Sequence, residues 1–339
     1  KENGEEVALV CSAFSKVTDQ LINAGKLAEK KDNTTYLEIF ENFRERHRIA
    51  IEELITVSDI KNVMLEEFVE SMVRVEDILK GINLLGELSD KTLAQLVSFG
   101  ERFSSFIVAG ALRSAGLQGV YVNAINLIRT DTNYLSAKVN LEKTNKNILD
   151  YFDVLNGTAV ITGFIGSDEH GNVTTLGRGG SDYTAAILAA ALNASILEIW
   201  TDVDGFMTAD PRIISNTYVI EKLSFSEAME LCNFGAKVIY PPTIFPVFHK
   251  NIPVVIKNTF NPDAKGTYIS QEKEHEVSKA IKGISSINDT SLITIQGLGM
   301  VGVIGVNYRI FRTLAKNGIS VFLVSQASSE NTTSIGVRN

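Results

Sequence analysis

The spacing of apolar residues divides the chain into helical and extended segments. Between residues 37 and 80, apolar side chains such as Phe40, Ile51 and Phe68 recur at helical spacing, with charged residues between them. This spacing predicts amphipathic helices whose polar faces are solvated. Short apolar runs elsewhere predict buried strands. These runs lie at residues 6–11, 120–122, 159–162, 196–200 and 252–256.

Helices are predicted between these strands, so the expected fold class is α/β. Helical segments are expected from Gln20 onward, from Ser98 to Arg113 and from Asp182 to Leu192. Strands that alternate with helices form mostly parallel sheets covered by helices on both faces. We therefore expect a sandwich built around a mostly parallel central sheet.

Turn and capping patterns mark several element boundaries. Residues 168–172 read Asp-Glu-His-Gly-Asn, which predicts a hairpin turn in which Gly171 takes a positive φ. The stretch 224–235 opens with Ser-Phe-Ser-Glu, a capping-box pattern that begins a helix. The pair Pro241-Pro242 suits the first turn of a further helix.

The composition changes toward the C-terminus. Residues 261–282 are polar and charged, which indicates a linker or a domain boundary. The order strand, helix, strand, strand that follows is the first part of a ferredoxin-like split βαβ unit. These elements are expected at 291–296, 303–316, 319–325 and 332–337. The last helix and strand of such a unit do not occur before Asn339, so the second domain is expected to be partial.

The stretch from Thr175 to Arg212 contains the strongest candidate site. It opens with Gly177-Arg178-Gly179-Gly180, begins a helix at Ser181-Asp182 and reaches a second polar loop, Thr201–Gly205, after a strand. Glycines let the backbone approach an anion, a helix N-terminus offers unpaired N–H groups, and arginine adds a planar fork for carboxylate or phosphate. Open α/β sheets bind ligands just past the carboxyl ends of strands. These features favour a phosphate site, although an ordinary strand-to-helix turn has similar glycines and no Walker motif occurs.

Several polar residues near the predicted element ends allow two interpretations each. The hydroxyls of residues 12–19 either cap a helix or line a substrate pocket. Glu101, expected in the first turn of its helix, either complements the helix dipole or faces a substrate ammonium group. Asp182 is either a first-turn carboxylate or a residue at the phosphates, and Lys237 is either solvated or a point charge near a nucleotide.

Composition and charge restrict the class of protein. The chain has 339 residues, enough for two domains, and its 45% hydrophobic and 21% charged content is typical of globular proteins. The formal net charge of −8 argues against bulk nucleic-acid binding. No apolar run is long enough to cross a bilayer and no signal peptide is visible at Lys1. Cys11 and Cys232 lack metal-ligand spacing and the histidines are scattered, so we predict free thiols, a cytoplasmic protein and no metal cluster.

Several motifs occur together and resemble those of aspartokinases. The kinase motifs are SFGER at 98–102, TTLGRGGSDYTAA at 174–186, WTDVDGFMTADPR at 200–212 and FGAKVIYPPT at 234–243. Two later motifs, TIQGLGMVGVIG at 294–305 and SVFLVSQASSENTTSIGV at 320–337, are similar to the regulatory ACT domain of that family. The sequence of the last motif is most similar to that of the bifunctional aspartokinase–homoserine dehydrogenases. The resemblance covers nearly the whole chain.

The resemblance implies both an architecture and an activity. It implies an amino-acid-kinase sandwich at residues 1–264, a linker at 265–282 and a partial ACT domain at 283–339. The implied reaction is phosphorylation of the β-carboxylate of L-aspartate to 4-phospho-L-aspartate with ATP and Mg²⁺, the first step toward lysine, threonine and methionine. It further implies feedback control by threonine or lysine, with threonine favoured, and homo-oligomers, dimers or larger, formed through the ACT domains.

The resemblance also implies roles for individual residues, because positions in the matching motifs correspond to site residues of the family. Asp182 and Arg178 would be the catalytic residues. The aspartate-binding residues would be Ser12, Thr18, Glu101, Phe164, Arg178 and Ser181. The nucleotide-binding residues would be Gly179, Gly180, Thr201, Asp202, Gly205, Met207, Arg212 and Lys237. Met207 departs from the tyrosine often found at its position.

One family motif is absent from this sequence. The Lys-Phe-Gly-Gly loop that grips the phosphates does not occur. The chain as given is therefore expected to turn over weakly or not at all, while its aspartate pocket persists. Two rival functions are compatible with the motifs. A sibling kinase for glutamate or acetylglutamate would share the nucleotide loops but lack the Ser-Phe-Gly-Glu helix, and a non-catalytic amino-acid sensor would keep only the regulatory role.

Overall fold

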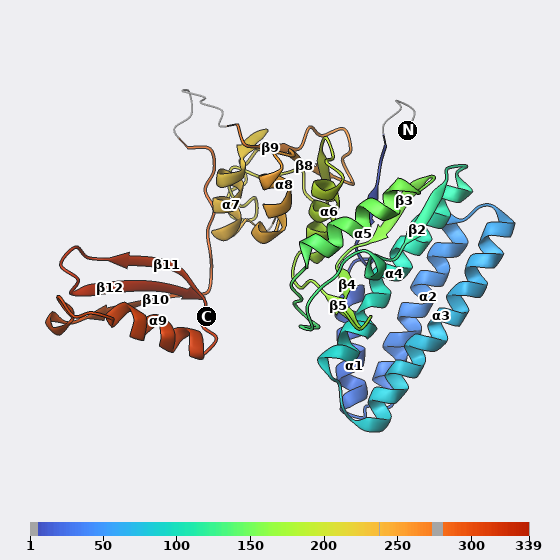
Figure 1. Cartoon of the computed structure of the whole chain (residues 1–339), viewed down its shortest axis with the longest axis horizontal. Coiled ribbons are helices and arrows are strands. Elements are labelled where there is room, and N and C mark those ends of the chain that lie inside the picture. The colour runs from blue at the N-terminus through green and yellow to red at the C-terminus, as the bar shows by residue number, and fades with distance from the viewer. Residues whose placement is uncertain (1–5, 237, 273–280, 339) are drawn as a thin grey trace.

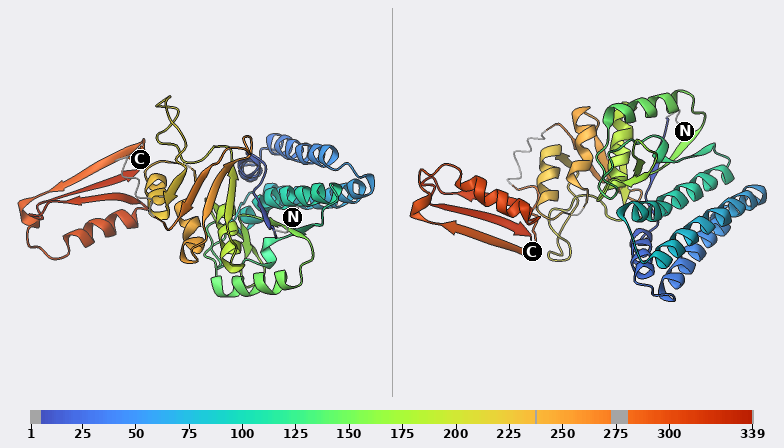
Figure 2. Two further views of the ribbon diagram at one scale, coloured as in Figure 1. Left: turned by 90° about the horizontal axis from the view of Figure 1, so that it is seen from above. Right: turned by 60° about the horizontal axis from the view of Figure 1, so that its bottom comes forward.

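The computed structural model describes residues 6–236, 238–272 and 281–338. Helices α1–α4 lie at one end of the molecule, two small sheets lie in the middle, and the C-terminal strands with α9 lie at the other end (Figure 1). The two further views show the same order along the long axis (Figure 2). The predicted α/β class is confirmed.

The first sheet contains three parallel strands in the order β1-β3-β2. These strands are β1 (Leu9–Cys11), β2 (Gly119–Val122) and β3 (Thr158–Thr162), and all five residues of β3 are buried because it is the central strand. Parallel neighbours need long crossover connections. The crossover from β1 to β2 contains all four long N-terminal helices.

Those helices pack their apolar faces into one core, as the spacing predicted. They are α1 (Val17–Glu29), α2 (Thr35–Leu54), α3 (Ser58–Leu85) and α4 (Asp90–Ser114). Their shared core is rich in phenylalanine, including the fully buried rings of Phe40, Phe43 and Phe68. Charged residues occupy the outer faces, as in the exposed Arg44–Glu41 pair of α2.

Helix α4 begins earlier than the sequence suggested. The prediction placed its start at Ser98, but the helix begins at Asp90, where Ser89 is the N-cap and its Oγ accepts a hydrogen bond from the N–H of Thr92 at 3.2 Å. Gly100 lies inside the helix. A glycine is needed there because a Cβ would lie 2.9 Å from the Cβ of Ala13. Glu101 is therefore in the middle of the helix, and the helix-dipole interpretation of this carboxylate was wrong.

The second sheet has the order β6-β8-β9-β7. Its strands are β6 (Leu197–Thr201), β7 (Lys222–Ser224), β8 (Val254–Asn258) and β9 (Thr267–Ser270). Strands β6 and β8 are parallel, as are β7 and β9, while β8 and β9 are antiparallel. Strand β9 lies within residues 265–282, which the sequence indicated as a linker. The polar composition misled because only two of its residues, Thr267 and Ile269, turn fully inward.

The two sheets share one helix, α6 (Gly180–Ala191). Ala186 and Ala189 pack into the core of the second sheet, whereas Ile187 and Leu188 pack into the core of the first. Helix α6 lies between the two sheets (Figure 1). Its alanines allow close approach to the second sheet, and its larger side chains fill the core of the first, so the helix ties the two halves of the sandwich together.

The remaining elements of this part include the predicted hairpin and the predicted helix after residue 224, together with a helix, α5, that was not predicted. Hairpin strands β4 (Ile165–Ser167) and β5 (Val173–Thr175) flank the predicted turn, where Gly171 has a φ of 78°. The other helices are α5 (Leu141–Asp153), α7 (Phe225–Asn233) and α8 (Phe245–His249), with short 3₁₀ turns at Ala124–Asn126 and Pro241–Ile244. The predicted capping box of α7 is confirmed.

The C-terminal unit is a strand–helix–strand–strand layer, as predicted. Its elements are β10 (Thr290–Gln296), α9 (Val306–Lys316), β11 (Val321–Gln326) and β12 (Thr332–Arg338), with a 3₁₀ turn at Leu298–Met300. Strand β12 pairs antiparallel with both β10 and β11. Among the described residues, no helix is both long and apolar enough to cross a membrane.

Candidate functional site

A cleft of about 310 Å³ lies where the loop after β1, the middle of α4 and the start of α6 meet. It is lined by Ser12, Thr18, Glu101, Phe164, Gly177, Arg178, Gly179, Gly180, Ser181 and Asp182. The structure thus brings together every residue predicted to hold aspartate, the predicted catalytic Asp182, and two of the predicted nucleotide residues. Segments far apart in the sequence therefore form one concave surface.

The glycine-rich turn forms one wall of the cleft by using conformations that favour glycine. Gly177 and Gly179 have φ values of 74° and 69°, and Gly179 is the N-cap of α6. A Cβ on Gly180 would lie 2.7 Å from the ring of Phe164. The turn thus places its backbone along the cleft, where the absence of side chains on three glycines lets a ligand approach closely.

Phe164 lines the cleft beside Gly180 in a strained conformation. It has a φ of 67°, which is unusual for a bulky residue. Its N–H donates to Thr184 Oγ1 at 3.2 Å, and its carbonyl accepts from the N–H of Leu176 at 2.8 Å. Backbone strain of this kind persists only where the surroundings enforce it and is common at functional sites.

Glu101 presents a buried carboxylate to the cleft. Its residue is only 4% exposed, and within the described structure its Oε2 atom has no hydrogen-bond partner. Burial raises the pKa of Glu101 to about 7, and the hydrogen bond from the backbone of Ala13 opposes that shift only in part. A buried carboxylate without a counter-charge is suited to a cationic ligand, which would repay its desolvation.

Asp182 lies in the first turn of α6, and one side faces the cleft. It remains half-exposed through that opening, but protein surrounds it on the other sides, and burial raises the pKa of Asp182 to about 6. No cation is among the causes of the shift. The cleft therefore contains two carboxylates that both lack a cationic partner strong enough to set their pKa.

Arg178 lies at the rim of the cleft and is exposed. Its guanidinium carbon is 5.9 Å from the centroid of the Tyr240 ring, which lies just before the 3₁₀ turn at Pro241–Ile244. Tyr240 is not among the site residues predicted from the sequence. Only the folded chain brings this ring, from the second half of the sandwich, to the rim of the cleft.

Four of the other predicted nucleotide residues, Asp202, Gly205, Met207 and Arg212, lie on the loop after β6, and Thr201 ends that strand; none of them lines the cleft. Thr201 Oγ1 donates to Asp202 Oδ1 at 3.3 Å, and Met207 forms an isolated bridge with Val219. Arg212 is paired with Asp210, with Nη2 at 2.7 Å from Oδ2, and its side chain is 79% exposed. Lys237, also predicted to bind the nucleotide, lies outside the described residues.

Gly205 allows this loop to pack against the second sheet. It has a φ of 140°, and a Cβ there would lie 2.4 Å from Thr267 Oγ1. The next residue, Phe206, is fully buried, and its N–H donates to the same Thr267 oxygen at 2.8 Å. Asp204 accepts hydrogen bonds from the side-chain amides of Asn258 and Asn261 at 2.8 and 3.2 Å. These anchors fix the loop at the carboxyl ends of β6 and β8.

The segment that leads into the C-terminal unit contacts the same loop. The N–H of Ile284 donates to the carbonyl of Thr208 at 2.8 Å. Lys282 Nζ lies 3.1 Å from Oε1 of Glu227, the residue that completes the capping box of α7. The route from the C-terminal unit to the predicted nucleotide loop is therefore short.

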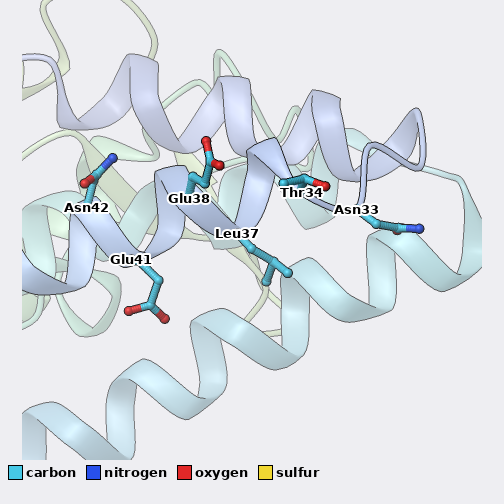
Figure 3. A pocket seen from close by; sticks show the side chains of 6 residues that line it. All are labelled: Asn33, Thr34, Leu37, Glu38, Glu41 and Asn42. Atoms are coloured by element: carbon cyan, nitrogen blue, oxygen red, sulfur yellow. The ribbon is translucent and has the colours of Figure 1, made fainter.

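A second hollow, of about 520 Å³, lies on the outer side of α2 and shows no convergent chemistry. Its lining residues are Asn33, Thr34, Leu37, Glu38, Glu41 and Asn42, all exposed. Figure 3 shows Glu38 and Glu41 pointing to different sides of the helix. Across the described chain, no group of three or more His, Cys, Asp or Glu residues could hold a metal ion.

Comparison with family models matches residues 1–258 to the amino acid kinase family and residues 293–339 to the ACT domain. Among curated proteins, the chain is 34% identical over 343 residues to bifunctional aspartokinase/homoserine dehydrogenase 2 of Arabidopsis thaliana, covering 99% of this chain and 37% of that protein. It is 35% identical over 332 residues to the bifunctional enzyme of Haemophilus influenzae, covering 96% of this chain and 40% of that protein. The chain thus spans about two fifths of the length of these relatives.

Solved structures show the same similarity. The fold matches E. coli aspartokinase III in complex with aspartate and ADP with a TM-score of 0.84 and 31% identity, covering 98% of this chain and 72% of that one. It matches the same enzyme in complex with lysine and aspartate with a TM-score of 0.77 and 30% identity, covering 97% of this chain and 71% of that one.

Proposed function

The chain belongs to the aspartokinases of the amino acid kinase family, and on that premise we propose that it binds L-aspartate and phosphorylates the β-carboxylate with ATP. The observation that carries this proposal is the cleft around Glu101, because its charges complement an amino-acid dicarboxylate. The solved relative with aspartate and ADP supports the same ligands. The reaction would yield 4-phospho-L-aspartate, the first intermediate toward lysine, threonine and methionine.

Each charge of aspartate has a proposed partner in the cleft. The ammonium group would pair with Glu101, whose buried Oε2 lacks a protein partner in the described structure. The α-carboxylate would pair with Arg178 at the rim, and the β-carboxylate would face the start of α6 near Ser181. Ser12 and Thr18 would supply hydroxyls, and Phe164 would close the apolar side.

The proposed chemistry is positioning rather than proton transfer. A β-carboxylate oxygen forms a bond to the γ-phosphorus of ATP, the bond from that phosphorus to the β–γ bridging oxygen breaks, and ADP leaves with the electron pair. The carboxylate is already ionised at neutral pH, so no base is needed to activate it. Cations and N–H groups that neutralise the transferred phosphoryl group would therefore provide most of the acceleration.

Asp182 is proposed to organise charge at the phosphates. Mg²⁺ in phosphoryl-transfer sites is usually held by one or two carboxylates together with the phosphates of the nucleotide. The cleft fits that pattern, since Asp182 is an oxygen donor without a cationic protein partner among the causes of its pKa shift. When bound, Mg²⁺ would neutralise phosphate charge. Gly179 would offer its backbone N–H at the start of α6, and Gly180, whose N–H donates to the carbonyl of Gly177 at 3.0 Å, would let the turn approach the phosphates closely.

The loop after β6 is proposed to hold the nucleotide. Asp202, Gly205, Met207 and Arg212 lie on it, Thr201 immediately precedes it at the end of β6, and Lys237 is assigned to the same function by its motif alone. Because Arg212 is largely exposed and its partner Asp210 is only two residues away, its guanidinium can turn toward a phosphate at little cost.

Regulation is proposed to act through the C-terminal unit. We propose that this unit is an ACT domain at residues 283–339. The solved relative in complex with lysine and aspartate supports an amino-acid effector, and threonine remains the alternative favoured by the bifunctional relatives. We also propose that the protein forms a homo-oligomer through its ACT domains and is located in the cytoplasm.

The test of the function is a direct comparison of ligands. Isothermal titration with L-aspartate, L-glutamate and N-acetylglutamate should show binding of aspartate alone, and an ADP-release assay should show whether the bound aspartate is phosphorylated. Binding of glutamate or acetylglutamate in preference to aspartate would favour a sibling kinase. Binding of lysine or threonine without any aspartate binding would favour a non-catalytic sensor.

A further inference from the structure

The loop Ser12–Lys16, between β1 and α1, carries substrate-site groups and ends in a turn in which the N–H of Val17 donates to the carbonyl of Phe14 at 2.9 Å. Ser12 lines the cleft, and the backbone of Ala13 contributes a hydrogen bond to Glu101. Lys16 has a left-handed φ of 68°, which is uncommon outside glycine and costs free energy. The neighbouring helices must therefore hold this loop in place.

Helix α4 holds one side of the loop. Ser104 Oγ donates a hydrogen bond to the carbonyl of Ser12 at 2.6 Å. Ala13 packs against Gly100, where any larger residue would collide with it. These contacts fix the first part of the loop but do not reach Phe14 or Ser15.

Helix α2 holds the other side of the loop, because Arg46 and His47 on this helix contact Phe14 and Ser15. We call the group of Phe14, Arg46 and His47 the Phe14 clamp. The rings of Phe14 and His47 are stacked, with centroids 4.9 Å apart and planes 7° from parallel. Arg46 Nη1 donates to the carbonyl of Ser15 at 2.7 Å, and its guanidinium carbon lies 5.7 Å from the centroid of Phe14. The clamp therefore fixes both a side chain and a backbone carbonyl of the loop.

His47 is built as an uncharged, rigid partner for this stack. Its Nδ1 lies 2.7 Å from the carbonyl of Phe43, so Nδ1 carries the hydrogen and donates it. Its ring is fully buried between Phe43 and Phe103, with centroids at 4.5 and 5.7 Å, and Nε2 has no partner in the described structure. Burial lowers the pKa of His47 to about 4, and the neighbouring Arg46 adds to that shift. A neutral ring fixed by one hydrogen bond is a stable surface for stacking.

We propose that Arg46 and His47 are positioning residues for the aspartate site, which hold Phe14 and thereby set the place of Ser12 and of the Ala13 N–H beside Glu101. Neither residue lines the cleft, so both act through the loop. This inference rests on the proposed function, since it assigns the cleft to aspartate. It adds a support from the outer helical hairpin that the family motifs do not contain.

The first experiment compares Arg46→Ala with a matched control on the same helix, Arg44→Ala. Arg44 is also exposed, and it pairs with Glu41 on the surface of the same helix. By isothermal titration, Arg46→Ala should weaken L-aspartate binding by about three- to tenfold, the range expected for one lost hydrogen bond. Its affinity for ADP and its melting temperature should match those of Arg44→Ala. Arg46→Lys keeps a donor for the Ser15 carbonyl and should restore most of the aspartate affinity.

A second pair of variants tests the stack. Phe14→Ala removes the stacked ring and should weaken aspartate binding at least as much as Arg46→Ala does, whereas His47→Phe keeps a flat ring and should stay close to wild type. Equal aspartate affinity in Arg46→Ala and Arg44→Ala would overturn the proposal, as would wild-type affinity in Phe14→Ala.

A further readout does not depend on the ligand. Amide hydrogen exchange at residues 13–16 should accelerate in Arg46→Ala but not in Arg44→Ala, because the loop loses an anchor. If the wild-type chain binds no aspartate, the proposed function fails while this measurement still decides the clamp. Unchanged exchange in Arg46→Ala would show that the loop is held without it, and would overturn the clamp.

Discussion

The backbone N–H of Ile284 donates to the carbonyl of Thr208 at 2.8 Å, which joins the segment entering the C-terminal unit to the loop after β6. Thr208 is itself tied across that loop, because its N–H donates to the carbonyl of Tyr218 at 3.0 Å. A displacement of the segment would therefore act on the proposed nucleotide loop directly. This contact gives the proposed regulation a physical route.

Removing this contact should uncouple effector from nucleotide. In Ile284→Pro, which lacks the N–H, lysine or threonine should bind as in wild type but should change ADP affinity less, with a loss of coupling of about 0.5–2 kcal/mol. Titrating ADP with and without the effector measures this quantity. Lys282→Met, which breaks the ion pair with Glu227, should act in the same direction, and Lys265→Met serves as an exposed control. Intact coupling in both variants would exclude this route.

The affinity for aspartate should depend on pH through Glu101. Its pKa of about 7 means that the free protein is increasingly protonated below neutrality, and a protonated carboxyl cannot pair with an ammonium group. The dissociation constant should therefore rise by about tenfold between pH 8 and pH 6. Titration of wild type and Glu101→Gln across this range checks the sign, because the variant should bind weakly at every pH.

Glu101→Gln should weaken aspartate binding but increase the stability of the fold. The folded state raises the pKa of Glu101 above the usual value of 4.5, so folding stability is lost as the pH rises from about 4.5 to 7. Above that pH range, the free energy of unfolding of Glu101→Gln should exceed that of wild type by about 1–3 kcal/mol. A lower melting temperature at pH 8 would indicate that the carboxylate has a stabilising partner in the protein.

Arg178→Ala should weaken aspartate binding with little effect on folding. The arginine is exposed at the cleft rim, so removing it leaves no buried charge behind, and the loss should be about 10- to 100-fold in affinity, as for a hydrogen bond to a charged group. The matched control is Arg113→Ala, at the far end of α4. If aspartate binds both variants equally, Arg178 has no place in the substrate site.

Asp182→Asn distinguishes an organising carboxylate from a base. As an organiser of cations at the phosphates, its loss should lower turnover by about 100-fold or more at every pH and should raise the Mg²⁺ concentration needed for half the maximal rate. The measurement is a pH–rate profile at several Mg²⁺ concentrations, made on a form of the protein that turns over. Loss of only the limb near pH 6, with the Mg²⁺ requirement unchanged, would instead assign Asp182 as a base.

Much of the fold could be predicted because its determinants are local. Helical spacing identified the N-terminal helices, and the pattern Ser224 to Glu227 marked the start of α7 through a hydrogen-bonded box only one turn long. Gly177 and Gly179 could be expected in a turn because glycine accepts positive φ at no steric cost. The order of motifs likewise identified the residues that the structure brings into one cleft.

Other properties exist only in the folded chain. The start of α4 was predicted at Ser98 but lies at Asp90, and Gly100 lies inside the helix, where it allows contact with Ala13 from a distant loop. Strand β9 has a polar composition and is ordered by its neighbours β8 and β7.

By itself, the sequence determined which residues are present at the cleft and the backbone conformations that its glycines allow. The tertiary structure decided their chemistry. The pKa of Glu101 rises because three distant segments exclude water from it, Arg178 meets Tyr240 across the two halves, and Phe14 is clamped by α2. Desolvation and stacking depend on which surfaces meet in space, and a linear pattern does not contain that information.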